Sequence, residues 1–396
     1  MSAALPEKAD VAVVGAGIIG LASAWRMAQR GVSVVVIDAD PGSGASGVAA
    51  GMLAPVTEAR LGEDSLLRLN MASWRQWPAF AAEVSAASGQ AIGYREDGTL
   101  VVALDADDRA VLDDLASRHR AMGLEVEALR GREARRLEPG LAPGVRSGLL
   151  AASERSVDPQ ATVEALMAAA TAAGAVLVRA AVERVVTDPG GDRVTGVVVA
   201  VEAAGGALAT TRLVEASTVV LAAGCHSATM PGVPERLLPP VRPVKGQVLT
   251  LRPPAGDAPI TRTVRGIIRG ASIYLVPRDD GRVVVGATVE ERGWDTRPTA
   301  GGAYQLLRDA LALVPGLDEA ELVGIRGGLR PGSPDDLPMI GPTGLPGLVT
   351  AAGHHRNGIL LTPVTAEAVA AAVTGDQMPD EVAAACDPRR FAAVRA

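Results

Sequence analysis

The sequence has very few cysteines and no cluster of metal ligands. Only two cysteines, Cys225 and Cys386, occur among its 396 residues, and they lie far apart in the chain. Disulfide-rich secreted proteins use closely spaced cysteines, so this chain does not belong to that class. A zinc site needs a compact set of cysteine and histidine ligands, which is missing as well. We therefore expect no metal, and we expect Cys225 to be a buried packing residue rather than a reactive thiol.

Aromatic residues and a surplus of positive charge are also lacking. The chain contains 4 Trp, 3 Tyr and 2 Phe, so most of its 48% hydrophobic content is aliphatic. It carries 38 Lys and Arg residues against 45 Asp and Glu residues, a net charge of −7. Nucleic acids and anionic membranes are bound through basic surfaces, so we expect neither as a partner.

No long hydrophobic run is present either. The first ten residues lack a charged-then-apolar leader pattern, and the longest apolar region is interrupted by glycines and by Arg26. A membrane-spanning helix needs about 20 apolar residues, so we expect none and predict a cytoplasmic protein. The chain is too long for one ordinary core, which predicts two domains.

The most informative stretch that the sequence does contain is residues 11–38. A short apolar run, typical of a buried parallel strand, leads directly into the glycine motif GAGIIG. Gly15 permits a tight turn, Gly17 lets backbone N–H groups approach phosphates, and Gly20 lets the following helix pack closely on the strand. The unpaired N–H groups at the start of that helix stabilise a bound pyrophosphate.

A second buried strand follows this helix and ends at Asp38. An acidic residue at that place, roughly 20 residues after the glycines, is positioned to accept hydrogen bonds from an adenosine ribose. The order strand, glycines, helix, strand and acid predicts a dinucleotide-binding domain. It does not distinguish NAD from FAD.

Residues 40–58 form a segment rich in glycine, alanine and serine. Its glycines allow close approach of the backbone to a ligand, although composition alone also fits a flexible surface loop. The segment follows the nucleotide strand directly, which favours contact with the cofactor.

Helical and β patterns alternate through the middle of the chain. Asp158 and Pro159 suit the N-cap and the first position of a helix, and His119 on an apolar helix face is interpreted as structural. The glycine-bounded strand that ends at Gly224 resumes the nucleotide domain after an excursion, so both domains are expected to be discontinuous. The expected elements are helices at 66–88 (one or two), 105–122 and 155–174, hairpins at 93–104 and 175–201, and a strand at 213–224.

The last part of the chain contains further β-rich runs and two glycine-bounded clusters. Runs at 241–252, 272–277 and 282–289 predict an antiparallel sheet, with a helix at about 302–313 after it. The clusters are GGLRP at 327–331 and AAGHHRNGILL at 351–361, the second of which predicts a helix that begins near Gly358.

Eight short motifs occur in the order found in the D-amino-acid-oxidase-like flavoproteins, over residues 10–375. The chain resembles the glycine oxidase branch of that family, which is associated with thiamine biosynthesis. The resemblance implies FAD rather than NAD. The motifs are GAGIIG, GMLAP, VDP, LAAG, PVKGQ, IYLVPR, GGLRP and GHHRNGILL.

The fold implied by this resemblance is an α/β architecture with an α+β substrate part. A doubly wound, Rossmann-like FAD-binding domain would carry a smaller domain with an antiparallel sheet. The expected segments are 1–90, 145–230 and 325–396 for the FAD-binding domain, and 91–144 and 231–324 for the substrate domain.

The resemblance also assigns cofactor contacts. Cysteines that hold flavin covalently in some relatives match neither Cys225 nor Cys386, so non-covalent FAD is expected. Two departures are visible, since Asp38 stands where many relatives have glutamate and His355 where an aromatic residue is common. The implied FAD contacts are Gly15, Gly17, Ile18, Ile19, Gly20, Asp38, Ala39, Ala45, Ser46, Ala50, Gly51, Met52, Val182, Gly224, His354, His355, Arg356, Asn357, Gly358, Ile359 and Leu360.

Three residues are the substrate candidates. The resemblance places Arg330, Tyr274 and Arg356 in the substrate pocket, and an arginine can hold a carboxylate through two parallel hydrogen bonds. The structural alternatives are a surface salt bridge for either arginine and core packing for the tyrosine.

The activity implied is oxidative deamination of glycine, and possibly of sarcosine or small D-amino acids. Hydride would pass from the substrate Cα to the flavin without a side-chain base, and O₂ would reoxidise the flavin to give hydrogen peroxide. The alternatives are a D-amino-acid dehydrogenase, a sarcosine-type amine oxidase, or a non-catalytic flavin-binding subunit. The expected partners are a small amino acid, O₂ and other copies of the chain, since relatives are often tetramers.

Overall fold

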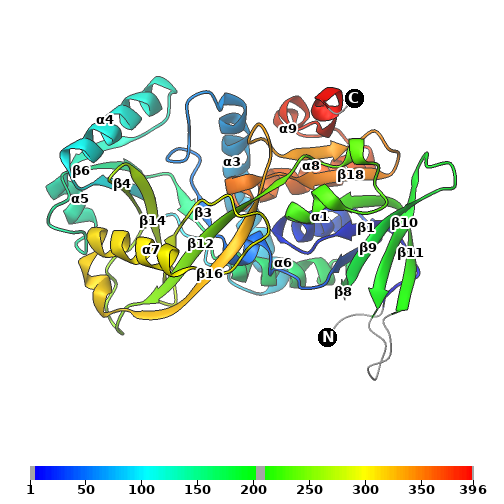
Figure 1. The fold of residues 1–396 in the computed structure, drawn as a ribbon, viewed down its shortest axis with the longest axis horizontal. Coiled ribbons are helices and arrows are strands. Elements are labelled where there is room, and N and C mark those ends of the chain that lie inside the picture. The colour runs from blue at the N-terminus through cyan, green and yellow to red at the C-terminus, as the bar shows by residue number, and fades with distance from the viewer. Residues whose placement is uncertain (1–4, 202–209, 395–396) are drawn as a thin grey trace.

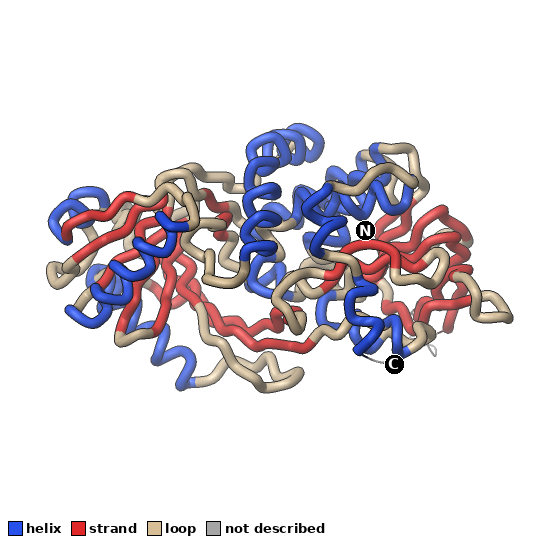
Figure 2. Tube along the Cα trace, turned by 90° about the horizontal axis from the view of Figure 1, so that it is seen from above, coloured by secondary structure: helices blue, strands red, loops and turns tan. Residues whose placement is uncertain are grey.

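A computed structural model describes residues 5–201 and 210–394 of the chain. The described part contains two eight-stranded sheets and one two-stranded ribbon. Figures 1 and 2 show the two large sheets at opposite ends of an elongated molecule, with helices between them. The site lies where the loops of one half meet a face of the other.

The first sheet has a parallel centre whose strands are almost continuously apolar, as expected for strands buried on both faces. Helices cover one face, and the antiparallel pair β9 and β10 folds over the other. Its strands are β1 (Lys8–Val14), β2 (Val34–Asp38), β8 (Val176–Arg179), β9 (Ala181–Thr187), β10 (Val194–Val201), β11 (Thr210–Leu221), β17 (Met339–Pro342) and β18 (Leu348–Ala352).

Four helices pack on one another and on the first sheet in one core. The longest of them, α3, lies between the two halves in Figure 1. It continues through Pro78 as one helix where the sequence left one or two open. The four are α1 (Ile18–Gln29), α3 (Asp64–Ser88), α6 (Pro159–Ala172) and α8 (Thr362–Thr374).

The second sheet is mostly antiparallel. α7 (Ala300–Leu313) and α5 (Gly131–Leu137) cover one face, and α4 (Ala106–Ala121) covers part of the other. The uncovered part of that second face contacts the glycine-rich loop of the first half through Val48 and Ala50. Its strands are β4 (Thr99–Ala103), β5 (Glu127–Arg130), β6 (Ser147–Ala151), β12 (Arg242–Arg252), β13 (Thr263–Ile268), β14 (Ala271–Pro277), β15 (Val283–Gly286) and β16 (Glu321–Gly332).

Short elements connect these layers. α9 lies beside the first half near the C-terminus (Figure 1). The short elements are α2 (Ala45–Val48), β3 (Met52–Leu53), β7 (Arg155–Ser156), η1 (Gly224–Thr229), η2 (Glu235–Leu237), η3 (Pro315–Glu319), η4 (His355–Asn357), α9 (Asp380–Ala385) and η5 (Pro388–Val394).

The predicted glycine roles agree with the local geometry. Gly15 has a φ of 107°, and a Cβ there would lie 2.5 Å from the carbonyl oxygen of Ala222 at the end of β11. A Cβ on Gly20 would overlap the carbonyl oxygen of Gly15. Asp158 caps α6 as predicted, since its Oδ1 accepts from the N–H groups of Gln160 (2.9 Å) and Ala161 (3.3 Å).

The hairpin predicted at 93–104 is wrong. β4 pairs parallel with β13 and antiparallel with β6, while Arg95 forms a bridge with Ser156. The turn at Asp97-Gly98 therefore leads into a strand whose partners are distant in sequence. Tertiary pairing overrides the local hairpin signal here, whereas the hairpin of β9 and β10 and the pairing of β14 with β15 form as predicted.

The helix predicted to begin near Gly358 begins later. Residues 355–357 form η4, hydrogen-bonded turns follow, and α8 starts at Thr362. The reason is Pro363, which lacks an N–H group and is therefore accommodated in the first turn of a helix. The dipole of α8 consequently starts four residues later than predicted.

The two sheets draw their strands from interleaved parts of the sequence. β6 and most of β16 fall in segments that were assigned to the FAD-binding domain, yet both pair in the second sheet. The exact domain limits remain a prediction. No helix in the described residues is both long and apolar enough to cross a membrane.

We expect Gly20→Ala to destabilise the protein, although alanine is the better helix former. The helix preference favours alanine by about 1 kcal/mol, but overlap with the Gly15 carbonyl forces α1 away from β1 at a cost of about 1–3 kcal/mol. Urea unfolding followed by circular dichroism measures the difference. Gly301→Ala in α7, where a Cβ would meet open space, is the matched control and should be neutral or stabilising. Equal midpoints for Gly20→Ala and wild type would contradict the packing role.

Candidate functional site

The N-cap residue of α1 has no side chain with which to cap the helix. Gly17 occupies the N-cap position, and Ser46 approaches from the glycine-rich loop so that its Oγ accepts from the Ile18 N–H at 3.1 Å. Ile18, Ile19 and Ser46, which the sequence placed at the cofactor, therefore come together at one helix end. Such an end attracts a phosphate group.

Asp38 supports this turn directly. Its Oδ2 accepts from the Ala16 N–H at 2.6 Å, and its Oδ1 accepts from the Asp40 N–H at 2.9 Å. The carboxylate thus fixes the glycine motif to the end of β2, a contact that the sequence did not reveal. Its role at the ribose stays a prediction.

The glycine-rich loop is held from the second sheet by Arg278. This buried guanidinium donates to the carbonyl oxygens of Ala50 (2.7 Å) and Val157 (3.1 Å) and lies 3.6 Å from Asp158. Gly51 is needed here because a Cβ would overlap the Val157 carbonyl and lie 2.9 Å from Pro159. The loop is therefore a fixed part of the structure rather than a flexible surface segment.

Arg278 had no predicted role. It stands within the IYLVPR motif, in which only Tyr274 was predicted to have a role. A charged residue directly after the buried apolar residues Leu275, Val276 and Pro277 was the available signal.

Tyr274 and Arg330 lie together on the sheet face that meets this loop. Two glycines make room for them, because a Cβ on Gly246 would lie 2.5 Å from the Arg330 Cζ and a Cβ on Gly286 would lie 2.5 Å from the Tyr274 ring. Arg330 donates to the Thr288 carbonyl at 3.2 Å, and its charge acts on the nearby Tyr274 hydroxyl. Burial raises the pKa of Tyr274, so its hydroxyl stays protonated although Arg330 acts in the opposite direction.

Arg330 differs from its arginine neighbours in its partners. Among the described residues, no carboxylate lies within ion-pair distance of it, so a surface salt bridge does not account for it. Arg356 forms ion pairs with Glu63 and with Glu58, the latter at 3.5 Å. Arg265 lies 2.6 Å from Glu58.

Glu58 joins this cluster without having been predicted. It follows the apolar GMLAPVT segment, and its position opposite three arginines depends on pairing between strands that the sequence does not show. Burial alone would raise the pKa of Glu58, but the charges of Arg265 and Arg356 outweigh it, so the pKa is lowered. Glu58 is therefore an anion at neutral pH.

His354 and His355 lie at the end of β18. His354 is buried, its Nε2 is 3.1 Å from the Thr365 Oγ1, and burial lowers its pKa to about 3. His355 has a φ of 48° and lies 2.8 Å from Asp336. His354 is consequently neutral and unsuited to carry a charge at neutral pH.

The remaining predicted cofactor residues are dispersed along the same half. Gly224 begins η1 after β11, and Val182 lies half-buried on β9. Met52 pairs with Ser156 in the small ribbon. Ala39 and Ala45 flank the bend of the glycine-rich loop, while Gly358, Ile359 and Leu360 occupy the turns before α8.

Two features indicate that a cofactor fits here. The N-cap residue of α1 is a glycine, which leaves room for a ligand at the helix end, and the buried Nδ2 of Asn357 has no hydrogen-bond partner among the described residues. Buried amide groups are nearly always satisfied, so this donor is available to a ligand.

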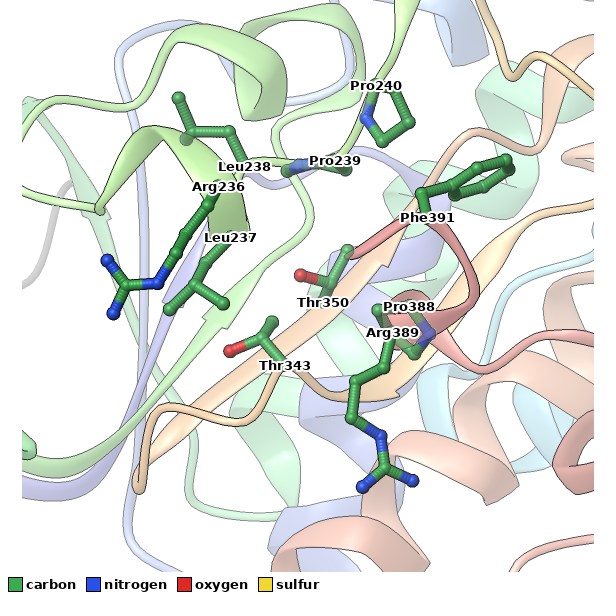
Figure 3. A pocket seen from close by; sticks show the side chains of 10 residues that line it. All are labelled: Arg236, Leu237, Leu238, Pro239, Pro240, Thr343, Thr350, Pro388, Arg389 and Phe391. Carbon is green, nitrogen blue, oxygen red and sulfur yellow. The ribbon is translucent and has the colours of Figure 1, made fainter. Parts of the chain in front are cut away.

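A small cavity elsewhere does not offer a substrate site. Figure 3 shows it between η2, β18 and the C-terminal segment, and its volume is about 20 Å³, room for roughly one water. None of the predicted site residues lines it. Its lining residues are Arg236, Leu237, Leu238, Pro239, Pro240, Thr343, Thr350, Pro388, Arg389 and Phe391.

Known proteins share this fold and much of this sequence. A family model described as FAD dependent oxidoreductase (DAO) matches residues 10–372. The glycine oxidase of Geobacillus kaustophilus (strain HTA426) is 34% identical over 373 residues, which cover 92% of this chain and 93% of that protein. The crystal structure of glycine oxidase from Geobacillus kaustophilus matches with a TM-score of 0.83 at 33% identity, over 96% of this chain and 98% of that chain. This match confirms the predicted fold class.

Two further proteins are also similar to this chain over most of its length. The structure of iminodiacetate oxidase from Chelativorans sp. BNC1 has a TM-score of 0.81 at 26% identity, over 96% of this chain and 98% of that chain. The bifunctional protein ThiO/ThiG of Synechocystis sp. (strain ATCC 27184 / PCC 6803 / Kazusa) is 33% identical over 388 residues. Those residues cover 96% of this chain but 54% of the relative, so the chain spans about half the length of that protein.

We expect the buried His354 to make the fold sensitive to acid. Its pKa is about 3 in the fold and near 6.5 when unfolded, so the unfolded state binds more protons between these values. Its contribution is complete above pH 6.5 and is lost as the pH falls, by about 2 kcal/mol between pH 7.5 and pH 5. Urea midpoints of the FAD-loaded protein at both pH values should show a smaller shift for His354→Gln than for wild type. His226→Gln, an exposed histidine, is the control, and equal shifts in all three proteins would exclude the effect.

Proposed function

Because the chain belongs to the DAO family of FAD-dependent oxidoreductases, we propose that it oxidises a small amino acid at the carbon that bears the amine. Glycine is the first candidate, and sarcosine and small D-amino acids are the others. The observation that carries this proposal is the Arg330–Tyr274 pair. It presents a guanidinium without a carboxylate partner, among the described residues, beside a phenol on a face that meets the cofactor loop.

Arg330 would bind the substrate carboxylate. Its half-buried guanidinium offers a planar pair of donors, and such charge-assisted hydrogen bonds are worth about 1.5–3 kcal/mol each. The Tyr274 hydroxyl would donate to the same carboxylate. Both groups are held in place by the sheet and by the glycines beneath them, so little conformational entropy is lost on binding.

Arg356 would border the substrate site rather than hold the carboxylate alone. Its Nη2 is paired with Glu63 and its Nε lies 3.5 Å from Glu58, while Nε and Nη1 are buried without a hydrogen-bond partner among the described residues. Substrate recognition by Arg356 therefore depends on how these ion pairs rearrange.

FAD would be held non-covalently along the path from α1 to η4. Ile18 and Ile19 would lie beside the pyrophosphate, Asp38 would face the ribose, and residues 45–52 and 354–360 would enclose the ring. When bound, FAD supplies the hydride acceptor and, with O₂, the route to hydrogen peroxide. Cys225 and Cys386 are buried thiols with pKa values raised by burial to about 12, which does not suit attachment.

The chain would not need a side-chain base. His354 is neutral and hydrogen-bonded to Thr365. It would therefore pack against the cofactor and would not accept a proton. The residues of the site would fix the carboxylate and exclude water. Bulk water would then hydrolyse the released imino acid to a keto acid and ammonia.

The relation to ThiO/ThiG supports a place in the synthesis of the thiamine thiazole, with an imino acid or its keto acid as the product that is used. Dehydrogenase, sarcosine-type and non-catalytic flavin-binding functions are the competing outcomes of the experiment below. An assembly of several copies is part of the proposal and can be measured by light scattering.

Anaerobic addition of glycine to the FAD-loaded protein should bleach the long-wavelength flavin band. Sarcosine, D-alanine and D-proline in parallel rank the amines. After admission of air, peroxide equal to the substrate consumed indicates an oxidase, while little peroxide indicates a dehydrogenase. If none of the amines bleaches the flavin, the proposed function is wrong.

Arg330→Ala should raise KM for glycine by roughly 100-fold or more while FAD stays bound, because it removes a charge-assisted anchor of about 3 kcal/mol. Steady-state kinetics and the flavin spectrum measure the two effects. Arg252→Ala, which removes a half-exposed arginine paired with Glu321 on the same sheet, is the matched control and should leave KM unchanged. An unaltered KM in Arg330→Ala would remove this residue from the site.

Gly246→Ala should weaken carboxylate binding without removing Arg330. The added methyl group occupies the place of the guanidinium, so we expect KM to rise about tenfold or more with FAD retained. Gly324→Ala on β16, where a Cβ meets nothing within 4 Å, serves as control. Equal KM values for both variants would show that the glycine does not position Arg330.

A further inference from the structure

We propose that Glu58 is an internal carboxylate that matches the site to substrates with a single carboxylate and discriminates against dicarboxylates. This inference rests on the proposed function and adds a determinant of specificity to it. It follows from the contacts of Glu58, from the way its loop is anchored, and from the balance of charge around Arg330.

Glu58 neutralises two arginines at once. One carboxylate oxygen lies 2.6 Å from the Arg265 Nη1, and the other lies 3.5 Å from the Arg356 Nε. The side chains of all three residues are largely buried, with exposed fractions of 17%, 13% and 12% for Glu58, Arg265 and Arg356. Both arginines would otherwise be available to an anion from solution.

The position of Glu58 is fixed by a second buried glutamate. Glu154 accepts from the N–H groups of Val56 (2.9 Å) and Thr57 (2.6 Å) and from the Thr57 hydroxyl (2.8 Å). Arg265 donates to the Thr57 carbonyl at 2.9 Å. The backbone immediately before Glu58 is thereby held in place, so Glu58 cannot easily turn away to make room for a second substrate carboxylate.

The site has one net positive charge. Arg265, Arg330 and Arg356 face Glu58 and Glu63, so three positive charges meet two negative ones. At the rim, the exposed Arg60 lies 4.0 Å from Glu63, and Asp336 lies against His355, so these two outer charges offset each other. Burial lowers the pKa of His355 and raises those of Tyr274 and Glu154, which favours the neutral form of all three near pH 7.

One surplus charge suits one carboxylate. Arg265 is the direct cross-strand neighbour of Tyr274, so its side chain stands on the same sheet face, beside the groups proposed to bind the first carboxylate. With Glu58 in place, that second carboxylate would meet a like charge in a poorly solvated site. Such juxtaposition disfavours binding of the dicarboxylate.

The test compares binding of acetate and malonate to the FAD-loaded protein, followed by the change in the flavin absorbance. The variants are Glu58→Gln, Glu58→Asp and the double variant Glu58→Gln/Arg265→Gln, with Glu321→Gln on an exposed edge of the same sheet as control. We expect Glu58→Gln to lower the Kd of malonate relative to that of acetate by about tenfold or more. Glu58→Asp, the double variant and Glu321→Gln should stay near the wild-type ratio, since the first two keep or restore the charge balance.

An unchanged ratio in a folded, FAD-bound Glu58→Gln protein would overturn the inference. If Glu58→Gln does not hold FAD, Arg265→Gln decides instead: it lowers the net charge to zero and should weaken acetate binding about tenfold or more, whereas Arg265→Lys should not. Unchanged acetate affinity in Arg265→Gln would then overturn it. Because these readouts need no turnover, failure of glycine to reduce the flavin would refute the proposed function and leave this test intact.

Discussion

The arrangement of the site depends on placing three guanidinium groups in a poorly hydrated seam between two sheets. Buried charges are tolerated only when they are paired and hydrogen-bonded, and here Glu58 and Glu63 supply the pairing. The loop that carries Glu58 is in turn held by Glu154. Arg330 is the member left with only neutral partners among the described residues, and it is the one on the face that meets the cofactor loop. The same cluster of arginines and glutamates thus compensates the buried charges and contains the group proposed to bind the substrate.

Glycines, which have no side chain, provide the space that this seam requires. Gly246 and Gly286 lie under the two groups proposed to bind substrate, while Gly15, Gly20 and Gly51 allow backbones to approach within van der Waals contact. Only Gly15 and Gly51 of these five also need a positive φ. Space, more than backbone freedom, explains why the second sheet carries glycine at positions where β-strands ordinarily favour larger residues.

Local signals in the sequence were sufficient for the nucleotide half and for the elements bounded by turns. Strand, glycine motif, helix and Asp38 are contiguous, so each supports the assignment of the next. The hairpin predicted at 93–104 is wrong because the partners of β4 lie more than 40 residues away, and α8 starts later than predicted because Pro363 lacks an N–H group and lies in the first turn. Glu58, Arg265 and Arg278 were missed for a related reason, since their partners come from different strands and loops. The resemblance to flavoproteins pointed to Arg330 and Tyr274, whose adjacency no spacing rule would reveal.

Arg278 links the two halves through thermodynamic coupling. Arg278 follows a strand of the second sheet. Its guanidinium donates hydrogen bonds to the Ala50 carbonyl, in the loop expected to line the flavin, and to the Val157 carbonyl just before α6. Any ligand that orders this loop must also stabilise the docking of the second sheet. By reciprocity, any loosening of that sheet weakens the binding of the ligand. Cofactor retention is therefore a property of the whole molecule and can be impaired by changes far from the nucleotide fold.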